Sequence, residues 1–465
     1  MPTTLNTSVS ARDDGILRSL HPDCPDWQTL GPTTRDAALR TAAVRANVDA
    51  EERTALWSKG FNRRTFLKAG MGIGVAALGS QLVTSRVSYA AADTPSTGTL
   101  VVIFLRGGMD GLSLLVPAND PYLLDKRPEI MVRGSALIPM ERGFALHPSM
   151  APLQALKDAG KLAVVPAVST PDLSRSHFQA QDCLERGSSN ALTSGWLDRV
   201  LEVAGPGTTF RSVALGGMLP RSLMGGSDSL AMYNLDSLRI DVDDDDVEPT
   251  RAALESLYTG LEHPIASQTT LALGALSTAQ AIRDNRPPVP AVTYPQDSNF
   301  ADALASLAEL IKSNVGVRVA CIDVGGWDTH TGMGTVDSGD MKTQLDELAT
   351  SLKAFTDDIG SNLDSTTIVT MSEFGRRVEQ NASGGTDHGH GNAVLVLGGG
   401  VSGGVKGYWE PLSDENLASE EGDVPGWNDY RDVLTEIVTK RLGISAASIS
   451  TVFPAWSPSP IGVMV

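Results

Sequence analysis

Leu100-Val101-Val102-Ile103-Phe104-Leu105 is an unbroken run of apolar residues, half of them β-branched, and the pair Gly107-Gly108 follows it closely. A run of this kind predicts a central strand of a sheet that is covered on both faces. Similar runs lie further along the chain, at 162–168, 318–322, 367–371 and 394–397. We therefore expect a sheet of buried strands.

The stretches between these runs have helical patterns. Apolar residues recur at three- and four-residue spacing in 149–159, 178–185, 301–312 and 341–359, which predicts amphipathic helices. Strands that alternate with helices favour an α/β fold, here a three-layer α/β/α sandwich with a mainly parallel central sheet. In such sheets ligands bind beyond the carboxyl ends of the strands.

Residues 219–298 differ in composition from the rest. The acidic run Asp241-Val242-Asp243-Asp244-Asp245-Asp246-Val247-Glu248 precedes a long helical pattern from Arg251 to about Asp284, so we expect a helical insertion. The run lacks the glycine turn and the spaced glutamate of a calcium-binding loop. A solvated turn that caps the next helix is favoured over a calcium site.

The first part of the chain predicts export. Asn62-Arg63-Arg64-Thr65-Phe66-Leu67-Lys68 precedes a short Gly- and Ala-rich apolar stretch and Ser88-Tyr89-Ala90, an order typical of a twin-arginine signal peptide and its cleavage site. We assign the signal to residues 61–92, which predicts the twin-arginine translocase as a partner and a periplasmic or extracellular location. Residues 1–60 are predicted to be a disordered extension, unless the start codon is misassigned. Residues 93–465 form the predicted catalytic domain.

Charge and cysteine content limit the partners of the exported part. The whole chain has a net charge of −18, and because residues 1–92 contain 11 Lys and Arg against 8 Asp and Glu, the remainder is near −21. A protein this acidic repels phosphate backbones, which argues against nucleic acid as a partner. No later segment has 18 consecutive apolar residues, so no stable membrane span is expected after cleavage. Cys183 and Cys321 form either one disulfide or two buried thiols, and the apolar neighbours of Cys321 favour a thiol.

Side chains that can bind metals gather at the predicted strand ends. Trp327-Asp328-Thr329-His330 follows one strand, Ser372-Glu373 ends another, and Thr386-Asp387-His388-Gly389-His390 fills a Gly-rich loop. The candidate metal ligands are Asp110, Asp328, His330, Glu373, Asp387, His388 and His390. Oxygen and nitrogen ligands without a thiolate suit one or two divalent ions such as zinc, manganese, magnesium or calcium.

The candidate nucleophile lies in Ser174-Arg175-Ser176-His177-Phe178-Gln179-Ala180-Gln181, which follows a predicted strand and opens a helix. A serine there lies at the positive end of the helix dipole, next to free backbone N–H groups. Ser176 is preferred to Ser174, with a metal or His177 to activate its hydroxyl and with Arg175 or Arg106 to hold substrate oxygens. The alternative is that either serine only caps the helix.

Several of these stretches together resemble the bacterial domain-of-unknown-function 1501 family, over roughly residues 98–455. The matching motifs are Leu105-Arg106-Gly107-Gly108-Met109-Asp110-Gly111-Leu112-Ser113, Arg175-Ser176-His177-Phe178-Gln179-Ala180-Gln181, Gly195-Trp196-Leu197, Trp327-Asp328-Thr329-His330, Ser372-Glu373-Phe374-Gly375-Arg376, and Asp387-His388 with Gly398-Gly399-Gly400. That family is similar to the alkaline phosphatase and sulfatase superfamily. The resemblance implies an α/β/α sandwich and two metals that bind the substrate anion and activate a serine, threonine or formylglycine nucleophile.

The resemblance also implies roles for individual residues. Asp110 would be the metal ligand after the first strand, Ser176 the nucleophile, and Asp328 with His330 ligands of the other metal. No Cys-x-Pro-x-Arg motif surrounds the nucleophile segment, which disfavours formylglycine chemistry.

Two assignments remain open for the last ligands. Either Glu373 is the strand-end carboxylate and His388 the late histidine, or Asp387 and His388 are the usual pair and His390 is the late histidine.

These patterns lead to one principal hypothesis and two alternatives. We expect an exported, metal-dependent hydrolase that acts on a phosphate or sulfate ester, either a small molecule or a component of the cell envelope. The first alternative is a non-catalytic exported binding protein that retains the fold and part of the metal site. The second is a metal-dependent transferase of the cell envelope.

Overall fold

The computed structural model describes residues 98–258, 264–287 and 291–465. A nine-stranded sheet forms the centre of this part of the chain, in the order β13-β5-β12-β9-β1-β8-β6-β7, with β14 paired to β5. The strands are β1 (Thr99–Leu105), β5 (Leu162–Ser169), β6 (Ser212–Leu215), β7 (Leu230–Met232), β8 (Val319–Val324), β9 (Thr366–Met371), β12 (Asn392–Gly398), β13 (Gly404–Val405) and β14 (Asn428–Asp429). β12 is antiparallel to both of its neighbours and the other pairings are parallel. The predicted α/β fold with a mostly parallel sheet is confirmed.

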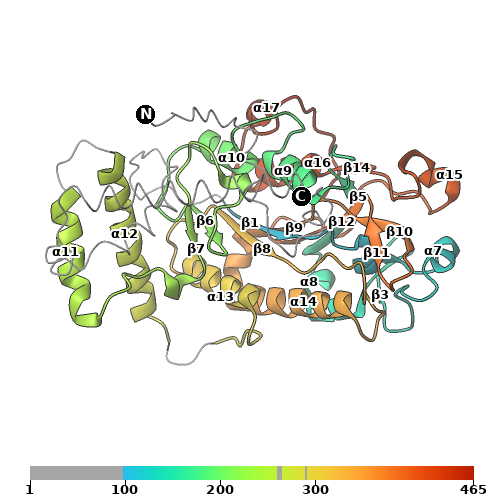
Figure 1. Cartoon of the computed structure of the whole chain (residues 1–465), viewed down its shortest axis with the longest axis horizontal. Coiled ribbons are helices and arrows are strands. Elements are labelled where there is room, and N and C mark those ends of the chain that lie inside the picture. The colour runs from blue at the N-terminus through green and yellow to red at the C-terminus, as the bar shows by residue number, and fades with distance from the viewer. Residues whose placement is uncertain (1–97, 259–263, 288–290) are drawn as a thin grey trace, which may run out of the picture. The chain divides into compact units, whose positions relative to one another are not determined.

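Helices cover both faces of the sheet (Figure 1). One layer consists of α9 (His177–Arg186), α10 (Trp196–Ala204), α16 (Tyr430–Leu442) and α17 (Ile449–Val452), and the other of α8 (Gln154–Asp158), α13 (Asn299–Lys312) and α14 (Asp340–Ile359). Leu100, Val102 and Phe104 of β1 pack in one core with Trp196 and Tyr430. Because side chains alternate along a strand, the buried residues between them face the second helical layer. Both faces of β1 are therefore apolar, which is why its sequence is an unbroken apolar run.

Smaller elements lie around this sandwich. They are β2 (Leu115–Pro117), β3 (Ile138–Pro139) and β4 (Phe144–Leu146) in one small sheet, the hairpin of β10 (Arg376–Gln380) and β11 (Thr386–His388), and the short helices α6 (Gly111–Leu114), α7 (Pro121–Lys126) and α15 (Asp414–Leu417). The hairpin matters for function because it connects the end of β9 with the start of β12.

The predicted helical insertion contains two helices, α11 (Val247–Tyr258) and α12 (Pro264–Asp284). The sequence predicted a single helix from Arg251 to about Asp284. The difference has a local cause, because proline fits the first turn of a helix but not its interior, and Pro264 is the first residue of α12. The acidic run forms a short 3-10 turn, Asp244–Asp246, directly before α11. β7, from the same stretch of sequence, joins the central sheet.

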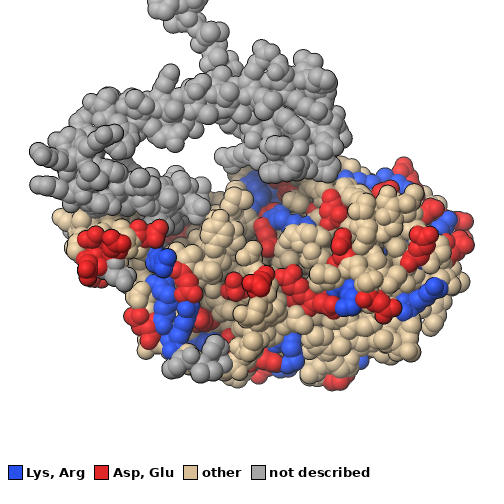
Figure 2. Space-filling view, turned by 60° about the horizontal axis from the view of Figure 1, so that its bottom comes forward, with Lys and Arg blue, Asp and Glu red and all other residues tan. Residues whose placement is uncertain are grey.

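Other sequence predictions have plain outcomes. Cys183 and Cys321 are free and buried, so the two thiols are the correct alternative. The predicted signal at 61–92 and the extension at 1–60 lie outside the described residues. The helices of the described part are all too short or too polar to cross a membrane. Asp and Glu side chains are spread over the face that Figure 2 turns toward the viewer, in keeping with the net charge of −18.

Candidate metal centre

Loops from distant parts of the sequence meet at one edge of the central sheet. The carboxyl ends of the parallel strands β1, β5, β8 and β9 lie at this edge, and β12, which runs the opposite way, begins there. His177 follows β5 at the start of α9, Asp328 and His330 follow β8, and His388 ends β11 just before β12. The predicted concentration of chemistry at the strand ends thus has a topological basis.

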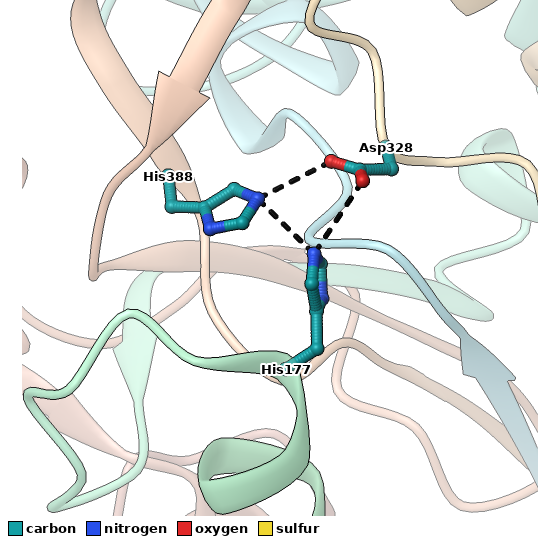
Figure 3. A group of neighbouring side chains, drawn as sticks. All are labelled: His177, Asp328 and His388. Atoms are coloured by element: carbon teal, nitrogen blue, oxygen red, sulfur yellow. Dashed lines mark hydrogen bonds and ion pairs between the residues drawn. The ribbon is translucent and has the colours of Figure 1, made fainter. Parts of the chain in front are cut away.

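Three histidine side chains converge on Asp328, and Figure 3 shows two of them. The Nε2 atoms of His177 and His330 lie 3.1 and 2.9 Å from Nε2 of His388. Asp328 Oδ1 is 3.0 Å from His330 Nε2 and 3.3 Å from His388 Nε2, and Oδ2 is 3.6 Å from His177 Nε2. We call these four residues the His/Asp group. Ligand atoms that bind a tetrahedral zinc ion at about 2.0–2.1 Å lie roughly 3.3 Å apart. The ligand atoms of His177, Asp328 and His388 all lie within 4.8 Å of one another, so the spacing of these three fits one divalent ion, with His330 beside them.

The opposite nitrogen of each imidazole faces an acceptor. His177 Nδ1 is 2.7 Å from Glu373 Oε1, and His388 Nδ1 is 2.9 Å from the carbonyl oxygen of Arg175. His330 Nδ1 is 3.3 Å from Asp387 Oδ1. An acceptor at Nδ1 holds a proton on that atom and leaves Nε2 as a lone pair, which is the usual arrangement behind a metal-ligating histidine.

A cation in the group would satisfy the proton positions that these acceptors favour. With protons on the Nδ1 atoms, three Nε2 lone pairs and the carboxylate of Asp328 face one another. A proton on His177 Nε2 satisfies its contact with Asp328, but the contact between His330 and His388 needs another proton. Moving the His330 proton from Nδ1 to Nε2 leaves Nδ1 as a lone pair facing the carboxylate of Asp387. One divalent cation among His177, His388 and Asp328 would satisfy the contacts of these three ligand atoms, so these residues fit a metal.

Hydrogen bonds and charges within the group shift the pKa values of His177 and Asp328 in the absence of a metal. Burial lowers the pKa of His177, but Asp328 and Glu373 outweigh it and raise this pKa to about 9. Burial likewise opposes ionisation of Asp328, but hydrogen bonds to His177, His388 and Arg376 hold its pKa well below the usual range. The metal-free group therefore carries an ionised Asp328 and a protonated His177, whose proton a metal would displace.

Two carboxylates predicted as ligands lie behind the imidazoles. Glu373 is buried, and its Oε1 accepts from the backbone N–H of Gly107 at 2.9 Å and from Gln181 Nε2 at 2.8 Å, besides His177. Asp387 contacts His330 and Asn381, on the outer side of the His330 ring. The structure thus gives both residues a supporting position.

Asp110 and His390 are not brought into the group. Both oxygens of the buried Asp110 accept hydrogen bonds from Arg127, at 2.6 and 2.9 Å. His390 is also buried, with Nε2 3.0 Å from the carbonyl of Thr170 and Nδ1 3.4 Å from Glu420. The structure therefore engages these two predicted ligands with other protein groups.

The arginines predicted to hold substrate are paired with carboxylates of the protein. Arg106 contacts Glu185 at 3.0 Å and Asp323 at 2.9 Å. Arg175 contacts the buried Asp423 at 2.7 Å. The Arg175 backbone has a φ of 55°, which is strained for a non-glycine residue, and its carbonyl is the group that orients His388. Arg175 thus supports the site through its main chain.

The two candidate serines, Ser176 and Ser174, differ in their contacts. Ser176 is the N-cap of α9, directly before His177, and its side chain makes no cap hydrogen bond. Ser174, in contrast, uses its hydroxyl to bind Asp172 at 2.5 Å and to accept from the N–H of Ser176. The first intrahelical bond of α9 runs from the N–H of Ala180 to Ser176, so earlier N–H groups point toward the site end of the helix.

Sequence reasoning gave no role to Arg376 or Gln181. Arg376 is fully buried, and it donates to Asp328 Oδ1 at 2.5 Å and to the carbonyls of Gly108 and Thr386. Gln181 lies four residues after His177, so both face the same side of α9, and both donate to Glu373. That spacing was the available signal for Gln181, whereas the partners of Arg376 depend on the tertiary fold.

Comparisons with known proteins match most of the described chain to one family. A family model described as "Protein of unknown function (DUF1501)" matches residues 98–421. A comparison with curated proteins found no match.

Among solved structures, the chain is similar to a sulfatase and to alkaline phosphatases. The PsFucS1 sulfatase from Pseudoalteromonas sp. is 13% identical, with a TM-score of 0.33, over 86% of this chain and 78% of that chain. Alkaline phosphatase from the Antarctic bacterium TAB5 is 11% identical, with a TM-score of 0.26, over 72% and 100%. A protein in the alkaline phosphatase superfamily from Vibrio parahaemolyticus is 11% identical, with a TM-score of 0.28, over 74% and 71%.

Proposed function

We propose that this chain, which belongs to the DUF1501 family of proteins of unknown function, is a metal-dependent hydrolase of phosphate or sulfate esters. The observation that carries the proposal is the convergence of three imidazole Nε2 atoms on Asp328, each with an acceptor behind its ring. His177, His388 and Asp328 would hold one divalent ion, with His330 beside it, and zinc or manganese suits these ligands. A divalent ion bound there supplies Lewis-acid polarisation of an ester oxygen.

Ser176 is the proposed nucleophile. The bond from its Oγ to phosphorus or sulfur forms as the bond to the alcohol oxygen breaks, and the hydroxyl proton ends on the released alcohol. Water then attacks the serine ester, releases phosphate or sulfate, and returns a proton to Ser176. The free N–H groups at the start of α9 offer hydrogen bonds to the oxygens of the transferred group.

Metal content tests the first half of the proposal. The exported protein is purified without chelator, and elemental analysis should find about one divalent ion per chain. Full-length protein reloaded with zinc or manganese should hydrolyse an aryl phosphate, an aryl phosphodiester or an aryl sulfate. Protein that holds well under one ion per chain after reloading would refute the proposal.

Two serine variants test the second half. Ser176→Ala should lower kcat by about a thousandfold or more, with the bound metal retained. Ser174→Ala is the matched control, because this serine lies two residues away and its hydroxyl is engaged by Asp172; it should stay within a few-fold of the parent. Equal activity of the Ser176→Ala variant and the parent would remove the serine from the mechanism.

One observation favours a second candidate, a non-catalytic exported binding protein. Arg106, Arg175 and Arg376 are all paired with carboxylates of the protein. A metal-loaded protein that binds an oxyanion but turns over no ester would support this second candidate. In either case we propose export by the twin-arginine pathway, on the basis of the motif at 61–92.

A further inference from the structure

The positive charge near the His/Asp group is already matched by carboxylates. Arg106 donates to Gln181 from Nη1 and contacts Glu185 and Asp323 through its other nitrogens. Arg376 donates to Asp328 and to main-chain carbonyls. Each of these two guanidinium groups is therefore held by acceptors of the protein.

Negative charge exceeds positive charge around the site. The carboxylates that contact the group or its two arginines are Asp323, Asp328, Glu185, Glu373 and Asp387. Burial raises the pKa of Glu185, but even without Glu185 four carboxylates face two guanidinium groups. Arg377 adds a third guanidinium charge, which acts on Asp387, so one divalent ion leaves the balance near a single positive charge.

The two most exposed of these carboxylates are Asp387 and Asp323. The side chain of Asp387 is 59% exposed beside His330, and that of Asp323 is 42% exposed beside Arg106. An anion that enters the site meets the field of both. The first negative charge of a substrate is attracted by the bound ion, but a second charge gains less from the ion and is repelled by these carboxylates.

We infer that the reacting group of the substrate carries a single negative charge. This description fits a phosphodiester or a sulfate monoester, which are monoanions, and excludes a phosphate monoester, which is a dianion at slightly alkaline pH. The inference rests on the proposed hydrolase function and specifies its substrate class.

Three esters with the same leaving group test the inference. The metal-loaded, full-length protein is assayed at pH 8 with p-nitrophenyl phosphate, methyl p-nitrophenyl phosphate and p-nitrophenyl sulfate. At least one of the two monoanions should exceed the dianion in kcat/KM by tenfold or more, and which one does so separates the phosphodiester from the sulfate. A preference for the dianion overturns the inference but leaves the hydrolase proposal standing. Turnover of none of the three defeats the hydrolase proposal itself.

Variants that remove a carboxylate charge test whether Asp387 and Asp323 cause the preference for a monoanion. Asp387→Asn and Asp323→Asn should each raise the ratio of dianion to monoanion kcat/KM by about three- to tenfold. Within one metal-saturated variant, changes in folding and in metal affinity cancel from this ratio. Asp337→Asn is the control, because this residue lies in the same loop as Asp328 but outside the group, and its ratio should not change. An unchanged ratio in both test variants, or two bound ions per chain, overturns the inference.

Discussion

The loops after β1 and β8 have the same sequence pattern, but the aspartate at the end of that pattern has different contacts in the two loops. Gly107-Gly108-Met109-Asp110 follows one strand, Gly325-Gly326-Trp327-Asp328 follows its parallel neighbour, and the two loops touch. A Cβ on Gly107, whose φ is 124°, would lie 2.6 Å from the backbone nitrogen of Asp328. Yet Asp110 is buried in an ion pair, whereas Asp328 is at the centre of the His/Asp group.

The arginine that reaches each aspartate explains the difference. Arg127 occupies both oxygens of Asp110, at 2.6 and 2.9 Å. Arg376 is hydrogen-bonded to Oδ1 of Asp328, while Oδ2 faces His177 at 3.6 Å. A carboxylate bound through both oxygens stabilises the fold, and one bound through a single oxygen can still ligate a cation. The same short pattern thus gives a buried ion pair in one loop and a carboxylate among three imidazoles in the other.

The largest effect is expected from Asp328→Asn. The amide keeps the shape of the carboxylate but removes the charge that faces three imidazoles, so metal affinity should fall more than about a hundredfold and activity should be lost. Metal affinity is measured with Co²⁺, by its absorption spectrum. The unfolding of the metal-free variant should differ little from that of the parent.

The control for this variant is Asp337→Asn, in the same loop, which should bind Co²⁺ like the parent. An Asp328→Asn variant with the Co²⁺ affinity of the parent would mean that the imidazoles alone hold the ion. Asp328 would then not be a metal ligand, and the proposed difference between the two loops would not hold.

Asp110→Asn should have the opposite profile. It leaves the buried guanidinium of Arg127 without its counter-charge, which costs about 3–5 kcal/mol of unfolding free energy. Urea unfolding in chelator measures this cost, while Co²⁺ affinity of the folded protein should remain within about twofold of the parent.

Asp158→Asn, at an exposed ion pair, is the stability control and should change the free energy of unfolding by less than about 0.5 kcal/mol. A large loss of Co²⁺ affinity in Asp110→Asn would instead support the ligand role that the family resemblance implies for Asp110.

A smaller effect on metal affinity is expected from Gln181, which contacts Glu373 and through it the metal-facing His177. Gln181 and His177 donate to the same oxygen of Glu373, at 2.8 and 2.7 Å, so Gln181→Leu should leave Glu373 freer to turn away from His177. Loss of such an outer partner weakens metal binding by about 10- to 100-fold. The thermal midpoint of the metal-free protein should stay close to that of the parent.

Gln179→Leu is the matched control, since Gln179 is exposed on the same helix turn and lies outside the contacts of Glu373. Similar Co²⁺ affinities in the two variants would show that Gln181 does not position the metal ligand.

The sequence predicted the strands and most of the helices well because each is a local pattern. The runs at 100–105, 162–168, 318–322, 367–371 and 394–397 are all strands of the central sheet. The helix predicted at 149–159 is less regular, beginning as the 3-10 turn Pro148–Leu153 before α8, because Pro152 interrupts it. The gathering of His177, His330 and His388 near Asp328 also follows from strand ends that share one edge of a sheet.

The roles of individual side chains were harder to predict. Glu373 was predicted to be a ligand, and nothing near it in sequence shows that it contacts Nδ1 of His177, whose Nε2 faces Asp328. The partner of Asp110 is Arg127, which belongs to no recognised motif. Such roles depend on which sequence-distant residue contacts a side chain in the folded protein. Periodicity and local spacing do not contain that information.

The smallest effect is the pH dependence of the stability that the Asp110–Arg127 ion pair contributes. Burial works to raise the pKa of Asp110, but Arg127 outweighs it and the pKa is lowered. A lowered pKa in the folded state gives stability that is present above the unfolded value of about 3.9 and is lost as the pH falls through the folded value. The stability difference between the parent and Asp110→Asn should therefore be constant above about pH 5 and shrink below about pH 4.

Urea unfolding of both proteins in chelator, from pH 7 to pH 3, measures this difference, and the titration of other carboxylates cancels between them. A difference that grows toward low pH would mean that Asp110 is protonated in the folded protein. Asp110 would then no longer be the charged half of a structural ion pair, and the contrast with Asp328 would need another explanation.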